Sequence, residues 1–157
     1  MIGWLLDTNV ISTIIDPNGA PTVKAWARAQ DEDQFFLSVL TLAEYDKGIH
    51  NVAEDHPDRP RFVAARDGLA ARFAGRTLSV GDEVVRRWGV ISGAVKRVTG
   101  HAPPVIDTLF AATAIEHDLY FVTRNVRDVP KTGAAIFDPW RDEPTKFPLS
   151  PMPRRRG

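Results

Sequence analysis

Short apolar blocks alternate along this chain with longer segments of helical periodicity. A block of apolar residues without alternation is typical of a strand buried on both faces of a sheet. Such blocks predict strands over residues 2–6, 35–37, 77–80, 119–123 and 134–137. Apolar residues that recur at three- to four-residue spacing predict helices over residues 10–15, 22–30, 41–50, 62–73, 82–98 and 105–117.

Strands that alternate with helices are joined by crossover connections, which make neighbouring strands parallel. The pattern therefore predicts an α/β fold with a mostly parallel central sheet flanked by helices on both faces. The proline-containing segments 51–61 and 100–104 are expected to be loops. Apolar periodicity ends near residue 140. We therefore expect a folded domain over residues 1–140 and a Pro-rich, Arg-ended C-terminal tail over residues 141–157.

The composition of the chain is typical of a folded protein and excludes several classes of site. With 157 residues, of which 43% are hydrophobic and 25% charged, the chain has the composition of a folded globular domain. Twenty basic and twenty acidic residues cancel, so any nucleic-acid contact must come from a local patch. The lack of cysteine excludes disulfides, thiolate metal sites and cysteine nucleophiles. No apolar stretch approaches the roughly 20 residues of a membrane span, so a cytoplasmic protein without a membrane partner is expected.

Four acidic residues stand near the ends of predicted strands or the start of a helix. Asp7 ends the first strand, Glu44 follows the second, and Asp128 lies in the loop after residues 119–123. Asp107 stands in the first turn of the most apolar helix. Because parallel strands end at one edge of a sheet, where ligands bind in open α/β folds, we expect these carboxylates to converge there.

Each of these residues also has an ordinary structural explanation. Asp7 is placed to cap the following helix, and Thr41 with Glu44 fits the spacing of a capping box. Asp107 would interact favourably with the helix dipole, and Asp128 would be a solvated loop residue. The four positions taken together favour a site over these separate roles.

Clustered carboxylates repel one another unless a cation neutralises them. Oxygen ligands without histidine or cysteine favour Mg²⁺, with Mn²⁺ as the alternative ion. A hydrated Mg²⁺ leaves room for a phosphate oxygen, which is the basis of metal-assisted phosphodiester hydrolysis. The acidic residues therefore predict a metal-dependent phosphodiesterase.

Five segments resemble, in order, motifs of PIN-domain proteins, particularly VapC-type toxins of bacterial toxin–antitoxin systems. They are Leu-Leu-Asp-Thr-Asn-Val-Ile-Ser at 5–12, Ser-Val-Leu-Thr-Leu-Ala-Glu at 38–44, Val-Ile-Asp-Thr-Leu-Phe-Ala-Ala-Thr-Ala at 105–114, Phe-Val-Thr-Arg-Asn-Val-Arg-Asp at 121–128, and Asp-Pro-Trp at 138–140. The resemblance covers residues 2 to about 140. It implies a three-layer α/β/α PIN-like fold and a Mg²⁺-dependent endoribonuclease that a cognate antitoxin inhibits.

Matching the motifs residue by residue implies a set of catalytic and metal-binding acids, which are Asp7, Glu44, Asp107 and Asp128. It also implies a set of supporting polar residues, which are Thr8, Asn9, Thr123 and Asn125. Asp46 departs from the motif pattern, because many relatives carry a basic or polar residue there. Asn125 stands where some relatives carry an acid, which leaves open whether Asn125 or Asp128 supplies the fourth ligand position.

In the mechanism we expect, Asp7 and Asp107 hold the ion directly, while Glu44 and Asp128 orient its waters or hold a second ion. The predicted RNA-binding cations are Arg124, Arg127 and Lys131, whereas Lys47 is interpreted as a solvated surface charge. The expected partners are an RNA substrate, a cognate antitoxin and a second copy of the chain, within a homodimer or a larger toxin–antitoxin complex.

The alternative function is a PIN-like RNA- or protein-binding module without catalysis. Retention of all four acids argues against it, because unneutralised negative charge repels phosphate groups. A phosphatase of the haloacid dehalogenase type would need a second carboxylate two residues after Asp7, and the chain has Asn9 there. The motifs of serine hydrolases and P-loop nucleotide-binding proteins are absent.

Overall fold

A five-stranded parallel sheet runs through the centre of the protein, in the strand order β3-β2-β1-β4-β5. The computed structural model describes residues 3–141, so the predicted tail lies outside the described residues apart from Arg141. All four strand pairings are parallel. The strands are β1 (Trp4–Leu6), β2 (Phe35–Ser38), β3 (Thr77–Leu78), β4 (Tyr120–Val122) and β5 (Ile136–Phe137).

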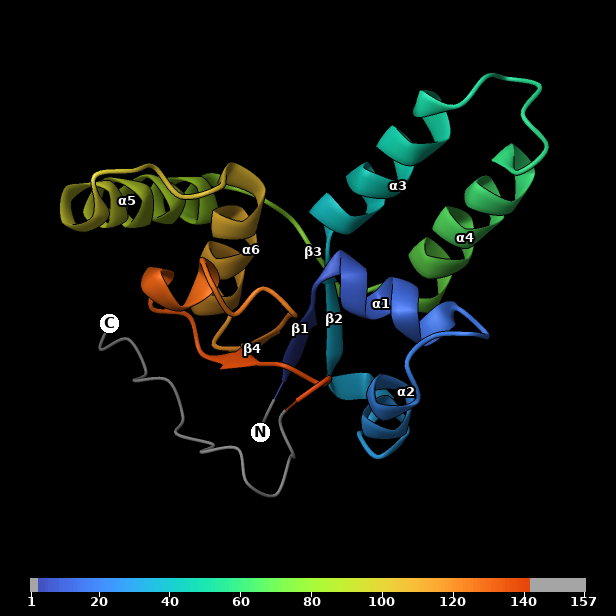
Figure 1. The fold of residues 1–157 in the computed structure, drawn as a ribbon, viewed down its shortest axis with the longest axis horizontal. Coiled ribbons are helices and arrows are strands. Elements are labelled where there is room, and N and C mark those ends of the chain that lie inside the picture. The colour runs from blue at the N-terminus through green and yellow to red at the C-terminus, as the bar shows by residue number, and fades with distance from the viewer. Residues whose placement is uncertain (1–2, 142–157) are drawn as a thin grey trace.

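Six helices and two short 3₁₀ turns connect the strands. In Figure 1, α1 to α4 lie to one side of the sheet, while α5 and α6 lie to the other. The predicted α/β fold with helices on both faces is confirmed. The helices are α1 (Thr8–Ile15), α2 (Pro21–Arg28), α3 (Val39–Asn51), α4 (Arg59–Arg72), α5 (Asp82–Thr99) and α6 (Val105–Glu116), and the turns are η1 (Glu32–Gln34) and η2 (Val129–Thr132).

Strand β1 is buried on both faces, which explains its unbroken apolar sequence. Successive side chains of a strand point to opposite faces. Trp4 and Leu6 accordingly pack into the core beneath α1 and α2, whereas Leu5 packs with Phe110 of α6 on the other face. The two cores thus meet at a central strand that cannot tolerate polar residues.

The strand order places β1 at the point where the chain reverses its direction across the sheet. Strands β2 and β3 extend the sheet on one side of β1, and β4 and β5 extend it on the other. In open α/β sheets, the crevice at the carboxyl ends of such strands is where ligands bind. The residues that directly follow β1 and β4 therefore stand in the most favourable position for a functional site.

Several predicted boundaries differ from the observed ones. The helix predicted from residue 41 begins at Val39, because Ser38 ends β2 and its hydroxyl accepts a hydrogen bond from the Leu40 N–H at 3.1 Å. The capping-box interpretation of Thr41 was therefore wrong, since Thr41 is buried inside the helix. The loop expected over 51–61 ends earlier, at Arg59, because proline is well tolerated in the first turn of α4.

The strand predicted over 119–123 is observed only at Tyr120–Val122, and two other predicted strands keep only two residues each. The strand expected over 77–80 pairs only at Thr77–Leu78, and that expected over 134–137 only at Ile136–Phe137. Both lie at the edges of the sheet, where each has a single neighbour. Within residues 3–141, no helix combines the length and the apolar character that crossing a membrane requires.

Candidate active site

Asp7 lies directly after β1, and its side chain is 7% exposed. Its backbone N–H donates to the Val122 carbonyl at 2.9 Å, which extends the pairing of β1 with β4 by one step. The Thr123 hydroxyl, which follows β4, donates to Asp7 Oδ2 at 2.7 Å. Asp7 occupies the N-cap position of α1 but forms no side-chain capping bond. The capping explanation therefore does not account for this carboxylate.

Burial raises the pKa of Asp7 to about 6 from its ordinary value of 3.8. The hydrogen bond from Thr123 opposes this shift, and the negative charges of Asp107 and Glu44 add to it. These two residues come from α6 and α3, so carboxylates far apart in the sequence lie within electrostatic range of Asp7. Three of the four predicted acids therefore share one region at the carboxyl edge of the sheet.

Asp107 is joined to the loop after β4 by a single side chain. Asn125 Nδ2 donates to Asp107 Oδ2 at 2.9 Å, and the Asn125 backbone N–H donates to Thr123 Oγ1 at 3.0 Å. Because Thr123 also donates to Asp7, a chain of hydrogen bonds runs from Asp7 through Thr123 and Asn125 to Asp107. Two of the predicted supporting residues thus lie between the two principal acids.

Asp128 is placed differently from the other three acids. Its backbone N–H donates to Asn125 Oδ1 at 3.2 Å, and it precedes the η2 turn. Its carboxylate is not among the charges that shift the pKa of Asp7. The side chain in contact with Asp107 belongs to Asn125, so the assignment of Asp128 as the fourth ligand stays a prediction.

Two hydroxyl pairs fasten α1 to α3. Thr8 Oγ1 lies 3.0 Å from Thr41 Oγ1, and Ser12 Oγ lies 3.0 Å from Tyr45 Oη. The sequence predicts a supporting role for Thr8, whereas Ser12, Thr41 and Tyr45 are not among the predicted site residues. The feature of the sequence that could have identified them is the four-residue spacing within each helix. This spacing places the two hydroxyls of each helix on the same helical face. Together they hold α3, which carries Glu44, against the helix that begins at Asp7.

The remaining predicted residues lie at the periphery. Asn9 is exposed, and its backbone carbonyl accepts a hydrogen bond from the Thr13 hydroxyl. Arg124 is exposed, with its guanidinium 5.0 Å from the centre of the Trp140 ring. Arg127 and Lys131 are also exposed on the segment that follows β4.

Asp46, the departure from the motif pattern, makes an ion pair with Arg66 of α4 at 2.8 Å. This contact between α3 and α4 explains Asp46 structurally, so no role in the site is needed to account for it.

The carboxylate oxygens at the carboxyl edge of the sheet are suitable ligands for a hard divalent cation. Carboxylate oxygens favour Mg²⁺ or Mn²⁺ over softer metals. Within residues 3–141, no group of three or more histidine, aspartate or glutamate side chains is close enough to hold an ion unaided. Mg²⁺ commonly binds through one or two carboxylates and keeps several waters. The Asp7 and Asp107 pair, with Glu44 nearby, fits that mode of binding.

Comparison with known proteins gives four findings. The PIN domain family matches residues 4–133. The chain is 30% identical over 138 residues to toxin FitB of Neisseria gonorrhoeae, covering 88% of this chain and 99% of FitB. It is 29% identical to the VapC ribonuclease Y4jK of Sinorhizobium fredii, covering 87% and 96% of the two chains. The solved structure of FitAB bound to an IR36 DNA fragment is similar with a TM-score of 0.79, at 28% identity over 89% of this chain and 97% of that chain.

Proposed function

Since this chain belongs to the PIN domain family, we propose that it is a Mg²⁺-dependent endoribonuclease that acts as the toxin of a toxin–antitoxin pair. The observation that carries the proposal is the meeting of Asp7, Asp107 and Glu44 beside the carboxyl ends of β1 and β4. The relatives support it, because one is named a toxin and another a ribonuclease.

In the proposed reaction, Asp7 and Asp107 would hold the ion, and Glu44 and Asp128 would orient its waters. A bound Mg²⁺ supplies charge stabilisation at the scissile phosphate and lowers the pKa of a bound water. Thr123 donates a hydrogen bond to Asp7, and Asn125 donates one to Asp107.

In this proposal, positively charged side chains of the chain bind the RNA substrate. Arg124, Arg127 and Lys131, all exposed on the segment after β4, contact RNA phosphates. If phosphate contacts supply the affinity, RNA binding weakens steeply as salt is added.

The raised pKa of Asp7 predicts that binding of the ion depends on pH. Below about pH 6 this carboxyl is increasingly protonated and no longer offers a negative oxygen. We therefore expect Mg²⁺ binding and RNA cleavage to rise together between pH 5 and pH 7.

The decisive experiment compares cleavage of a mixed RNA substrate with Mg²⁺, with EDTA, and with Asp107→Asn in Mg²⁺. Asp55→Asn is the matched control, because Asp55 is an exposed residue in the loop between α3 and α4. We expect cleavage only by the unchanged chain and the control with Mg²⁺, and a loss of at least a hundredfold in Asp107→Asn. Equal cleavage in all arms would overturn the metal-nuclease assignment. Tight RNA binding without cleavage in every arm would favour a binding module.

The proposed protein partner is a cognate antitoxin. One similar solved structure is that of FitAB on a DNA fragment, and the relative FitB is named a toxin. Expression of the chain alone is expected to arrest bacterial growth, and co-expression with the product of an adjacent small gene is expected to restore it. Arrest that also occurs with Asp107→Asn would separate toxicity from the proposed cleavage.

A further inference from the structure

The side chain of Asn125 is held from two directions in the loop after β4. Its Oδ1 accepts hydrogen bonds from the backbone N–H groups of Arg127, at 3.3 Å, and Asp128, at 3.2 Å. Its Nδ2 donates to Asp107 Oδ2 at 2.9 Å. The amide therefore spans the distance between its own loop and the first turn of α6.

These partners determine which way the amide faces. A backbone N–H is only a donor, so both N–H groups must meet the oxygen of the amide. The nitrogen is then left to face Asp107, where it supplies a neutral donor. A carboxylate at position 125 could keep the two backbone hydrogen bonds but would present a negative oxygen to Asp107.

The same loop also forms a hydrogen bond with Asp7, the other acid proposed to hold the ion. Thr123 donates to Asp7 Oδ2, and the Asn125 backbone N–H donates to Thr123. Each acid thus has its Oδ2 engaged by a neutral donor from this loop. Because residues 123 and 125 are two positions apart and hydrogen-bonded to each other, they fix the two carboxylates relative to one another.

We propose that Asn125 is a positioning residue that orients the Asp107 carboxylate for metal binding and couples it to the loop that carries Arg124 and Arg127. The proposal rests on the proposed function, since orientation matters only if Asp107 holds an ion. It differs from the view of position 125 as a weakened fourth ligand. A positioning donor loses its effect when it becomes a carboxylate, whereas a ligand position would gain from that change.

Titration with Mn²⁺ by isothermal calorimetry at pH 7.5 tests the proposal on the full chain. The variants are Asn125→Asp and Asn125→Ala, and Asn51→Asp is the matched control because Asn51 is exposed at the end of α3. We expect both Asn125 variants to bind Mn²⁺ about 10- to 100-fold more weakly, with the control unchanged. Asn125→Asp is nearly isosteric and keeps the acceptor for both backbone N–H groups, so it carries the test if Asn125→Ala does not fold.

The outcomes separate this proposal from the proposed function. Tighter binding or a second bound ion in Asn125→Asp would show a ligand position and overturn the positioning role. Unchanged affinity in a folded Asn125→Ala would overturn it as well. If the unchanged chain binds no Mn²⁺, the proposed function fails and the positioning role fails with it. If Mn²⁺ binding is lost in Asp107→Asn but kept in the Asn125 variants, the positioning role alone is overturned.

Discussion

Asp7 is a carboxyl group that the fold keeps away from water. Its pKa is about 6 in the folded protein against 3.8 ordinarily, chiefly because of burial. The folded state therefore binds a proton more tightly than the unfolded state does. Protonated Asp7 therefore contributes to the free energy of unfolding at low pH. This contribution is lost as the pH rises through about 6 and the carboxyl ionises in the folded protein. Two pKa units correspond to roughly 3 kcal/mol, which is an upper bound on the cost of ionised Asp7 at neutral pH.

Replacing Asp7 by asparagine removes this cost and keeps an oxygen that can accept the Thr123 hydrogen bond. In EDTA at pH 7, we expect Asp7→Asn to increase the free energy of unfolding by up to about 3 kcal/mol. The increase should shrink towards zero as the pH falls from 6 to 4. Urea denaturation at pH 7, 5.5 and 4 measures both effects. A gain that does not depend on pH would show that the charge of Asp7 is not its cause.

The start of α3 depends on Ser38, which is fully buried. Its hydroxyl satisfies the Leu40 N–H, one of the N–H groups that a helix start leaves without a partner. This cap sets where α3 begins and so where Glu44 stands along it.

We expect Ser38→Ala to lower the free energy of unfolding by about 1 kcal/mol, the usual cost of losing such a cap. Urea denaturation against Thr22→Ala, an exposed position in the first turn of α2, isolates the effect. An equal loss in both variants would mean that the Ser38 hydroxyl does not act as a specific cap.

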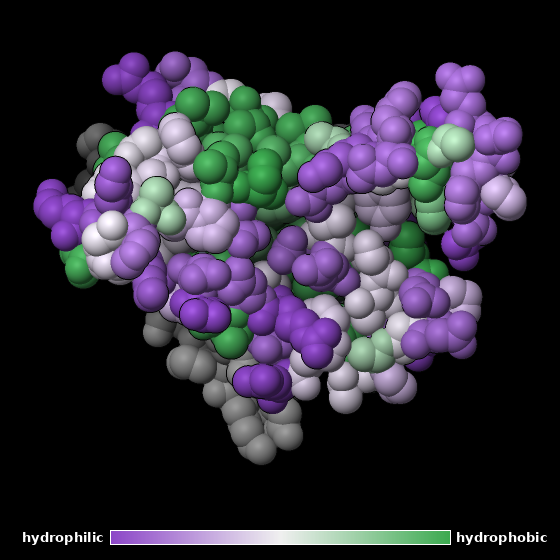
Figure 2. All heavy atoms as spheres, turned by 45° about the horizontal axis from the view of Figure 1, so that its top comes forward, coloured by the Kyte–Doolittle hydropathy of each residue, from purple (hydrophilic) through white to green (hydrophobic). Residues whose placement is uncertain are grey.

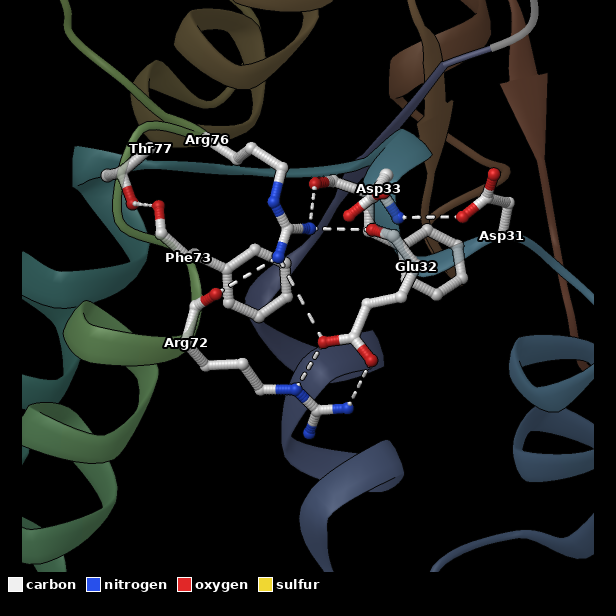
Figure 3. Close-up of polar contacts among 8 residues, drawn as sticks. Asp31, Glu32, Asp33, Arg72, Phe73, Arg76 and Thr77 are labelled. Carbon is white, nitrogen blue, oxygen red and sulfur yellow. Dashed lines mark hydrogen bonds and ion pairs between the residues drawn. The ribbon is translucent and has the colours of Figure 1, made fainter.

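Arg76 fastens the turn between α4 and β3 to the start of β2, as Figure 3 shows. Its guanidinium donates to the backbone carbonyls of Glu32, Phe35 and Arg72 at 2.6, 2.8 and 3.0 Å. The neighbouring ion pair of Arg72 with the Glu32 carboxylate is much more exposed. The two arginines therefore offer a comparison of a shielded cluster with a surface pair.

We expect Arg76→Met to lower the free energy of unfolding by roughly 2 to 3 kcal/mol, because charged hydrogen bonds to carbonyls are lost. Arg72→Met should cost less than about 1 kcal/mol, as exposed ion pairs usually do. Guanidinium denaturation of both variants measures the difference. A larger loss in Arg72→Met would assign the anchoring to the ion pair with Glu32 instead.

At the scale of the whole molecule, one surface stands out for its apolar character. Figure 2 shows hydrophobic residues gathered on the face that α5 and α6 present. Val105 and Ile106, at the start of α6, are 54% and 43% exposed, and Val85 of α5 is 44% exposed. Contiguous apolar surface on a folded protein is a common sign of an interface. Equal numbers of acidic and basic residues leave no net charge to oppose association of two copies.

This face is the surface that we expect to be buried in the predicted homodimer. Ile106→Glu is expected to shift the protein from dimer to monomer in light scattering coupled to size-exclusion chromatography. Ile15→Glu, in the last turn of α1, is the control for adding a charge at an exposed apolar position away from this face. A monomer in the unchanged chain would refute the dimer. A dimer that persists in Ile106→Glu would place the interface elsewhere.

Local sequence was enough to predict most elements, because strands and helices leave different periodicities. The apolar block of β1 and the helical spacing of α5 and α6 are confirmed as predicted in kind. Boundaries were less accurate where a single side chain decided them, as Ser38 does for α3. The edge strands β3 and β5 keep only two residues each, since each pairs with one neighbour only.

The sequence by itself determined the parallel α/β architecture and the acids that follow its strands, since hydrophobic burial and crossover connections act through local pattern. Only the tertiary structure decided which polar groups meet. Thr41 and Tyr45 reach their partners across 33 residues, and Asn125 reaches Asp107 across 18. Such contacts depend on how whole helices and loops are oriented, which no local pattern specifies. For the same reason, the raised pKa of Asp7 is a property of the folded molecule.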